Sequence, residues 1–321
     1  NLLLRVAFPN RRCLFMKPSA PNHPDWITDV HRCARAVRRR VLDHTLKNNG
    51  GYLSQACSAA EILSTLYLKV MHLGPSEGPK VPRPFPGVPG RDNPRSFTGS
   101  EYNGPKAPDL DRFIFSPVHY ALVLYSVLIE VDRLGPDALE QFNRDGSTME
   151  LIGAEHSPGH EVTAGSLGQA ISQAGGIALA RKLRGDTGRV WVFMSDGEFQ
   201  EGQTWEAFAN LSYRQIDNLG VYVDVNAQQC DGLMTSVMNI EPLAARLAAF
   251  GVNVHEVDGH DPEALAAAGE SWQKGRPLVV LAKTDPCRDM ELLRGRAPKL
   301  HYVRFKSDEE RRSYEQVLAE M

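Results

Sequence analysis

The sequence predicts an α/β fold with a mainly parallel sheet and helices on both faces. Four short apolar runs, at residues 189–194, 219–225, 252–257 and 277–282, have the length of buried strands. Segments of helical length alternate with them, which is typical of parallel sheets covered by helices. The 321 residues are enough to bury a large core.

Further elements follow from periodicity and helix-end signals. A basic amphipathic helix is expected at residues 25–48, because Gly50 and Gly51 follow it as a helix stop. A second helix is expected to begin at Ser58, where Ser58-Ala-Ala-Glu61 has the capping-box pattern. Three more are expected, at residues 113–134, 169–183 and 262–269.

Residues 74–111 interrupt this pattern with nine prolines and six glycines. They are expected to form a long irregular loop, which in a compact domain has a function of its own or lacks order. We expect residues 1–24 to be an N-terminal extension and residues 25–321 to form one domain that contains this loop.

Composition excludes several classes of protein. The net charge of −3 gives no reason to expect nucleic acid as a partner. No apolar run approaches the roughly 20 residues that span a bilayer, so no membrane association is expected. The five cysteines are scattered without metal-ligand spacing, which favours neither disulfides nor zinc and suits a reducing cytoplasm.

The most informative stretch joins two of the expected strands. Asp196 follows the run 189–194, and Asn226 follows the run 219–225. Parallel strands end at the same edge of a sheet, where ligands of open α/β folds bind. Asp196 alone could simply cap a helix. Together with Gly197 and Asn226, it instead favours a small divalent ion held by oxygen ligands and completed by phosphate oxygens and water.

Five segments, in the same order, resemble those of transketolases. The stretch from Asp196 to Asn226 is similar to that family's thiamin-diphosphate signature, GDG…N. The other four are Asp111-Arg-Phe-Ile-Phe-Ser-Pro-Val-His119, Glu161-Val-Thr-Ala-Gly-Ser-Leu-Gly-Gln169, Val257-Asp-Gly-His-Asp261 and Lys299-Leu-His301. The resemblance spans roughly residues 30–310 and implies the thiamin-diphosphate-binding fold, in the form that binds the cofactor's diphosphate (PP type).

The resemblance also implies roles for individual residues. Mg²⁺, or another divalent ion such as Ca²⁺ or Mn²⁺, would be bound by Asp196, Asn226 and the backbone carbonyl of Gln228. Thiamin diphosphate would be bound by Gly165, Leu167, Gly197, Glu198, His119, His301 and Asn226. The catalytic candidates are His119, His301, His156, Tyr52 and Glu201, the last at a contact between two subunits.

The chain departs from the family pattern at Tyr52, and this difference bears on which substrate is bound. Residues 50–54 stand where transketolases have S-G-H-P-G, so Tyr52 occupies the position of an active-site histidine. A phenol can donate a hydrogen bond, but with an ordinary pKa near ~10 it shuttles protons poorly at neutral pH.

The resemblance further implies a partner. Family members need a glutamate from a pyrimidine-binding domain, which follows the domain matched here, and the sequence is expected to lack it. We therefore expect the N-terminal subunit of a split, transketolase-like enzyme, in a hetero-oligomer built on a dimer. With a C-terminal, pyrimidine-binding subunit it would transfer a two-carbon ketol unit from a ketose, expected to be phosphorylated, to an aldehyde.

Two alternatives stay open from the sequence. The chain could be an E1-type component of a 2-oxo acid dehydrogenase or decarboxylase, a reading to which Tyr52 lends weight. It could also be a non-catalytic subunit that binds the cofactor or regulates a partner. The joint presence of Asp196, Asn226, His119 and His301 argues against the second, because a relic would be free to lose any of them.

Overall fold

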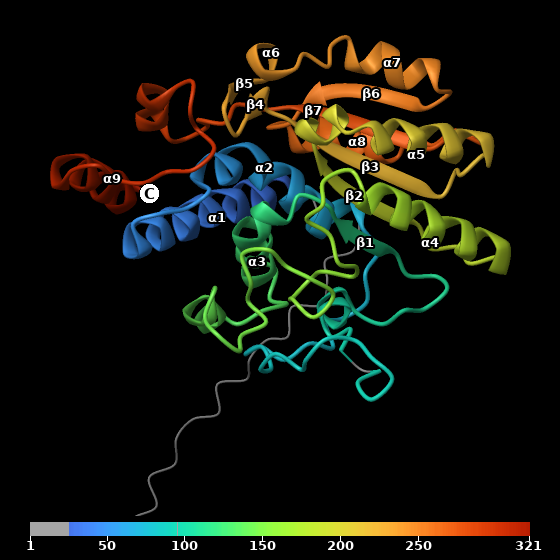
Figure 1. Cartoon of the computed structure of the whole chain (residues 1–321), viewed down its shortest axis with the longest axis horizontal. Helices are drawn as coiled ribbons and strands as arrows, with labels where there is room; N and C mark the ends of the chain where they lie inside the picture. The colour runs from blue at the N-terminus through green and yellow to red at the C-terminus, as the bar shows by residue number, and fades with distance from the viewer. Residues whose placement is uncertain (1–25, 95) are drawn as a thin grey trace, which may run out of the picture.

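A five-stranded parallel sheet forms the centre of the computed structural model, which describes residues 26–94 and 96–321 (Figure 1). The strands lie in the order β1-β2-β3-β7-β6, and every neighbouring pair is parallel. Their bounds are Arg112–Phe115 (β1), Val190–Ser195 (β2), Leu219–Val225 (β3), Asn253–Asp258 (β6) and Leu278–Lys283 (β7). The predicted α/β fold is confirmed, whereas the expected extension at residues 1–24 lies outside the described residues.

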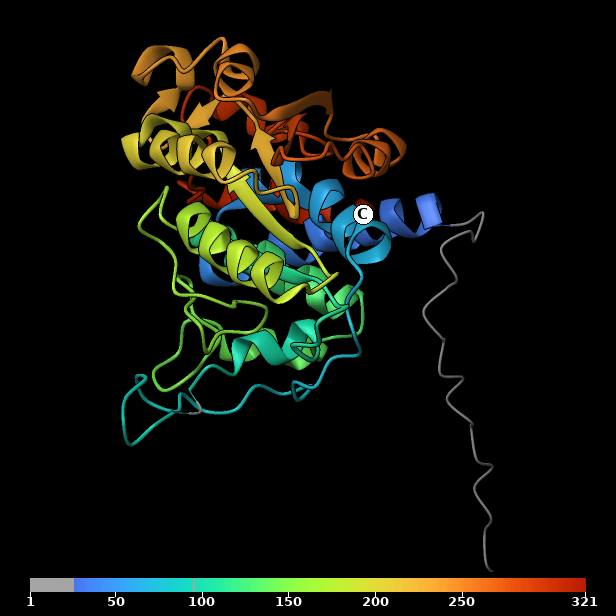
Figure 2. The same cartoon turned by 90° about the vertical axis from the view of Figure 1, so that its right-hand side faces the viewer.

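Helices cover both faces of the sheet, because side chains along each strand point alternately to one face and the other. In β2, Trp191 and Phe193 belong to one core, and Val192 and Met194 belong to the other. The first core also contains residues of α1 (Trp26–Asn48), α2 (Leu53–Thr65), α3 (Ala121–Glu130) and α8 (Pro262–Gly269). The second contains residues of α4 (Ala170–Arg184), α5 (Gly202–Tyr213) and α7 (Leu243–Ala249) (Figures 1 and 2).

The remaining elements are short, except for α9 (Asp308–Glu320), which packs beside α1. They are α6 (Met234–Val237), the antiparallel pair β4 (Gln228–Gln229) and β5 (Gly232–Leu233), a π-helical turn at Leu66–Val70, and 3₁₀ turns at Gly99–Asn103, Val118–Tyr120, Pro136–Gln141, Asp196–Gln200 and Glu291–Arg296. Within the described residues, none of the helices has the length and apolar character needed to cross a membrane. The four cysteines in this part of the chain are free thiols.

Two sequence predictions about helices were wrong. Helix α2 begins at Leu53 rather than at Ser58, because Ser58 is fully buried and its hydroxyl donates to Asp224 instead of capping. Residues 113–134 are not one helix. Their first residues form most of β1, since Phe113 and Ile114 fill the cores on opposite faces of the sheet, and α3 starts only at Ala121.

The irregular segment at residues 74–111 is confirmed, apart from one 3₁₀ turn at Gly99–Asn103. Most of it lies below the sheet in both views, and its last residues lead into β1 (Figures 1 and 2). Its inner part packs on the loop that follows α3: the Gly99 amide donates to the Glu155 carbonyl at 2.9 Å, and the Phe85 ring lies 4.6 Å from the ring of His156. The segment therefore folds back over the 151–161 region.

Candidate functional site

A cavity of about 260 Å³ lies at the carboxyl edge of the sheet, beyond β1, β2 and β3. Asp196 and Gly197 follow β2, Asn226 follows β3, and His119 lies in the turn after β1. The other lining residues are Tyr52, Ser54, Gln55, Tyr120, Leu167, Ser195, Gln228, Gln229, Cys230 and His301. The structure thus brings together the two strand-end side chains on which the metal prediction depends.

Asp196 is a buried carboxyl at the floor of this cavity, 2% exposed. Its Oδ2 accepts a hydrogen bond from the Ala227 amide at 2.8 Å, which joins the end of β2 to the loop after β3. Burial and the nearby Asp224 raise the pKa of Asp196 well above the usual range, because both disfavour the ionised form. A divalent cation would shift this balance toward the carboxylate.

Asn226 lines the same cavity, and hydrogen bonds hold its side-chain amide at both ends. Its Nδ2 donates to the Tyr120 hydroxyl at 3.0 Å and to Asp224 Oδ2 at 3.1 Å. Its Oδ1 accepts from the Gln228 amide at 2.9 Å. Sequence reasoning passed over Asp224. The signal that could have identified Asp224 is an acidic residue within an apolar strand, because a carboxyl group is costly to bury unless it has a specific role.

Two histidines and one tyrosine that line the cavity form a cluster of rings. The ring centroids of His119 and His301 are 5.0 Å apart, and Tyr52 lies 5.6 Å from the first and 5.3 Å from the second. Burial, assisted by His301, lowers the pKa of His119 to about 3, and burial also lowers the pKa of His301. Burial raises the pKa of Tyr52. All three rings are therefore neutral at neutral pH.

The first turn of α2 holds His301 in place. The Gln55 amide donates to the His301 carbonyl at 3.2 Å and lies 3.3 Å from the ring Nδ1, while the Ser54 hydroxyl donates to the Leu300 carbonyl at 3.0 Å. Gly51 and Val303 form a β-bridge beside them. Sequence reasoning missed Gln55, because no local pattern relates it to a residue 246 positions later.

Glu198 and Gly165 do not line the cavity, although both shape it. Glu198 is fully buried, and its carboxylate accepts from the amides of Ser195 and Gly168, each at 3.0 Å. These bonds close the 3₁₀ turn at Asp196–Gln200, so α5 begins only at Gly202. Gly165 has φ +109°, and a Cβ there would lie 3.0 Å from Val118 Cγ2, so only glycine fits beside the His119 turn.

The remaining two predicted residues, His156 and Glu201, also lie outside the cavity. The Nε2 of His156 is 3.0 Å from Glu150 Oε2, beneath the irregular segment. Glu201 is exposed just before α5, beside Gly168. Its role at a contact between two subunits stays a prediction, because the structure contains one chain.

The donors around the cavity fit a divalent ion bound together with a diphosphate. Asp196 and Asn226 supply a carboxyl and an amide oxygen, and the Oε1 of Gln228 is buried without a hydrogen-bond partner in the described structure. In this part of the chain, no three His, Cys, Asp or Glu side chains gather as a metal site. A cation here would therefore depend on the Asp196 carboxylate together with amide, carbonyl and phosphate oxygens, which are ligands that Mg²⁺ accepts.

A polar cavity at the carboxyl ends of parallel strands is typical of open α/β proteins, which bind their ligands at this edge of the sheet. The family model described as "Transketolase, thiamine diphosphate binding domain" matches residues 95–285. A putative uncharacterized transketolase family protein of Sinorhizobium fredii is 34% identical over 280 residues, which are 86% of this chain and 90% of that protein. The chain belongs to the transketolase family.

Further relatives show how much of the family's length is present. One of the subunits of apulose-4-phosphate transketolase from Actinobacillus succinogenes is 29% identical over 88% of this chain and 93% of that protein. The crystal structure of transketolase from Campylobacter jejuni has the same fold, with a TM-score of 0.66 at 21% identity, over 91% of this chain but 46% of that one. This chain therefore corresponds to the N-terminal half of the longer transketolases.

A buried histidine that does not line the cavity leads to a pH-dependent prediction. His160 is 1% exposed between Phe115 and Tyr125, and burial lowers its pKa to about 4. The unfolded chain, with an ordinary histidine pKa near ~6.5, takes up this proton first as the pH falls, so stability is complete above that pH and is lost toward pH 4. When the pH falls from 7 to 4.5, the lowered pKa of His160 should reduce the free energy of unfolding by about 2 to 3 kcal/mol. Urea unfolding at the two pH values measures this decrease, which should be smaller by the same amount in His160→Gln than in wild type. An equal decrease in both chains would contradict the prediction.

Proposed function

We propose that this chain is the N-terminal subunit of a thiamin-diphosphate-dependent, transketolase-like enzyme. The observation that carries the proposal is the joint placement of Asp196, Asn226 and two neutral histidines around one cavity in a chain of this family. Two relatives that match over most of their length are named as subunits of larger enzymes. One belongs to an apulose-4-phosphate transketolase, and the other to a 6-deoxy-6-sulfo-D-fructose transketolase of a Clostridium species.

In the proposed reaction, a two-carbon ketol unit passes from a ketose to an aldehyde. Thiamin diphosphate, when bound, supplies the carbanion chemistry. Asp196, Asn226 and the Gln228 carbonyl would hold the divalent ion, while His119 and His301 would donate hydrogen bonds to the diphosphate without adding charge. Tyr52 would donate a hydrogen bond to substrate rather than relay a proton, because its phenol stays protonated.

The substrate class follows from the reaction and from the relatives. The names of the two subunit relatives specify a phosphate on one sugar and a sulfonate on the other. We take a ketose with an anionic terminal group as the donor. The partner is a C-terminal subunit that carries the pyrimidine-binding domain and its glutamate, in a hetero-oligomer built on a dimer.

Reconstitution tests this function. The purified chain with thiamin diphosphate and Mg²⁺ should show no ketol transfer from xylulose 5-phosphate or fructose 6-phosphate to ribose 5-phosphate. Activity should appear when a partner subunit that carries a pyrimidine-binding domain is added, and it should be lost when the Asp196→Ala chain replaces the wild-type chain.

Each other outcome points elsewhere. Full turnover by the chain alone would contradict a split enzyme. Release of carbon dioxide from pyruvate by the reconstituted pair would favour the 2-oxo acid decarboxylase alternative. Tight cofactor binding without turnover of either substrate class by the pair would favour a non-catalytic subunit.

A further inference from the structure

Asp224 is a carboxyl residue near the carboxyl end of β3, two residues before Asn226, with no exposed surface. It accepts hydrogen bonds from four side chains on four different parts of the fold. They are Ser58 in α2 at 2.6 Å, Tyr120 in the turn after β1 at 2.9 Å, Thr284 after β7 at 2.5 Å, and Asn226 after β3 at 3.1 Å. All four donors are neutral, so no opposite charge compensates the free-energy cost of burying this carboxylate. This cost indicates that Asp224 has a function other than packing.

Asp224 contacts the side-chain amide of Asn226, and this contact affects which way the amide faces. A primary amide has a donor end and an acceptor end of nearly equal shape, so its surroundings decide which way it faces. Here the donor end, Nδ2, lies against Asp224 Oδ2 and the Tyr120 oxygen. The Tyr120 hydroxyl gives its own proton to Asp224, which leaves its oxygen free to accept from the amide. The reversed amide would place its oxygen against Asp224 Oδ2, which already accepts from Ser58 and Tyr120, and its NH₂ group against the Gln228 amide, which now donates to Oδ1.

We propose that Asp224 is a positioning residue, which turns the Asn226 amide so that its oxygen, rather than its NH₂ group, is offered to the divalent ion. This inference rests on the proposed function, because it concerns the ion of the cofactor site. An amide facing the other way would present two N–H donors to a cation and could not bind it.

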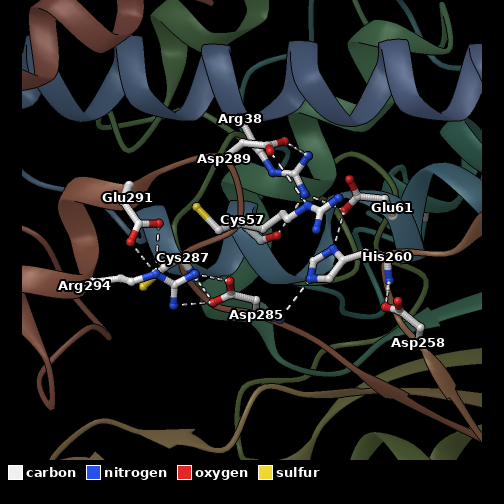
Figure 3. Close-up of polar contacts among 11 residues, drawn as sticks. Arg38, Cys57, Glu61, Asp258, His260, Asp285, Cys287, Asp289, Glu291 and Arg294 are labelled. Carbon is white, nitrogen blue, oxygen red and sulfur yellow. Dashed lines mark hydrogen bonds and ion pairs between the residues drawn. The ribbon is translucent and has the colours of Figure 1, made fainter.

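Asp224 can act in this way because it cannot turn along with Asn226. Its Oδ1 is held by Thr284, and the segment that carries Thr284 is itself anchored to the helices on one face of the sheet. The next amide, Asp285 N, donates to His260 Nε2 at 2.8 Å, and His260 Nδ1 lies 3.1 Å from Glu61 Oε2 in α2 (Figure 3).

The anchor continues beyond Glu61. This carboxylate is 4% exposed and also pairs with the buried Arg38 of α1 at 2.5 Å (Figure 3). Together, His260, Glu61 and Arg38 connect the segment after β7 to two helices. The carboxylate of Asp224 thus has a fixed place, and a fixed carboxylate imposes one orientation on its neighbour.

The test compares three variants that each disturb the hydrogen bonds of Asp224. Asp224→Asn keeps the shape but replaces an acceptor-only group with one that tolerates either amide orientation. Ser58→Ala removes a donor to Asp224 Oδ2 without touching Asn226 or Thr284, and it serves as the matched control for stability. Thr284→Val removes the donor that holds Oδ1 and so releases the carboxylate. Calorimetry measures Mg²⁺ binding in the presence of thiamin diphosphate, and urea unfolding measures the stability of each chain.

Asp224→Asn should weaken Mg²⁺ binding at least tenfold, within the roughly 10- to 100-fold range seen when partners of metal ligands are removed. Ser58→Ala should stay within about threefold of wild type even where it unfolds more easily, whereas Thr284→Val, which frees the carboxylate to turn, should lie between Ser58→Ala and Asp224→Asn. If affinity falls in step with stability across all three variants, Asp224 has only a structural role and the proposal is overturned.

A second measurement uses the Asn226→Asp background. A carboxylate at position 226 offers the same oxygen chemistry on both sides and needs no orientation, and it would also be repelled by Asp224. In that background, Asp224→Asn should leave Mg²⁺ affinity unchanged or improve it, and a tenfold loss would overturn the proposal. If the wild-type chain binds no Mg²⁺ with thiamin diphosphate, the cofactor site itself is wrong. If wild type binds and Asp224→Asn binds equally well, only the role of Asp224 is overturned.

Discussion

Asp196→Ala should abolish Mg²⁺-dependent binding of thiamin diphosphate while the chain remains folded. Asp196 is the only carboxyl group among the residues that line the cavity in the described structure, so its removal leaves a divalent ion without an anionic protein ligand. We expect a loss of at least 100-fold in affinity, which corresponds to about 3 kcal/mol.

The same substitution should cost the fold little. Burial already disfavours the ionised form of Asp196, so the folded chain without the ion gains nothing from this charge. The loss should be about 1 kcal/mol, for the hydrogen bond from Ala227. Calorimetric titration with thiamin diphosphate and Mg²⁺ measures binding, circular dichroism measures folding, and the exposed Asp145→Ala is the matched control. Undiminished binding by Asp196→Ala would refute the metal assignment.

His119→Ala and His301→Ala should each weaken thiamin diphosphate binding about 10- to 100-fold at saturating Mg²⁺. A hydrogen bond to a charged group contributes roughly 1.5–3 kcal/mol, and each lost bond would leave phosphate oxygens facing an empty part of the cavity. Their rings lie 5.0 Å apart, so the double variant should lose less than the product of the two single losses.

The pH dependence separates this account from one in which the histidines bind as cations. Burial, assisted by His301, lowers the pKa of His119 to about 3, so the His119 ring should not change charge between pH 6 and pH 8. The affinity ratio of wild type to His119→Ala should therefore be flat over that interval. A ratio that rises as the pH falls from 8 to 6 would show a protonated imidazole and contradict the prediction. His72→Ala, which alters a histidine that lies away from the cavity, is the control.

The parts of the site that sequence could predict share one property. Asp196 and Asn226 each follow a strand directly, and parallel strands must end at one edge of the sheet, whatever the details of packing. Their approximate meeting point therefore follows from chain order alone. The same reasoning explains why residues 189–194 and 219–225 were recognised as strands, since both are short and almost wholly apolar.

The parts that sequence missed depend on contacts between distant residues. Ser58 has the pattern of a helix cap, yet it lies inside α2, where its hydroxyl reaches Asp224, 166 positions later. Residues 113–115 are as apolar as a buried helix, and only their pairing with β2 makes them a strand. Glu198 belongs to the motif but faces the turn rather than the cavity, because the amides of Ser195 and Gly168 converge on its carboxylate.

By itself, the sequence determined the α/β class, the family and the strand ends at which the cofactor site lies. These depend on local periodicity and on the order of elements, which each segment carries without reference to the others. Only the tertiary structure decided which groups are neutral, which way the Asn226 amide faces, and which motif residues support the cavity rather than line it. Burial and hydrogen bonding decide these properties, and both arise only when residues as far apart as Ser58, Asp224 and Thr284 are packed together.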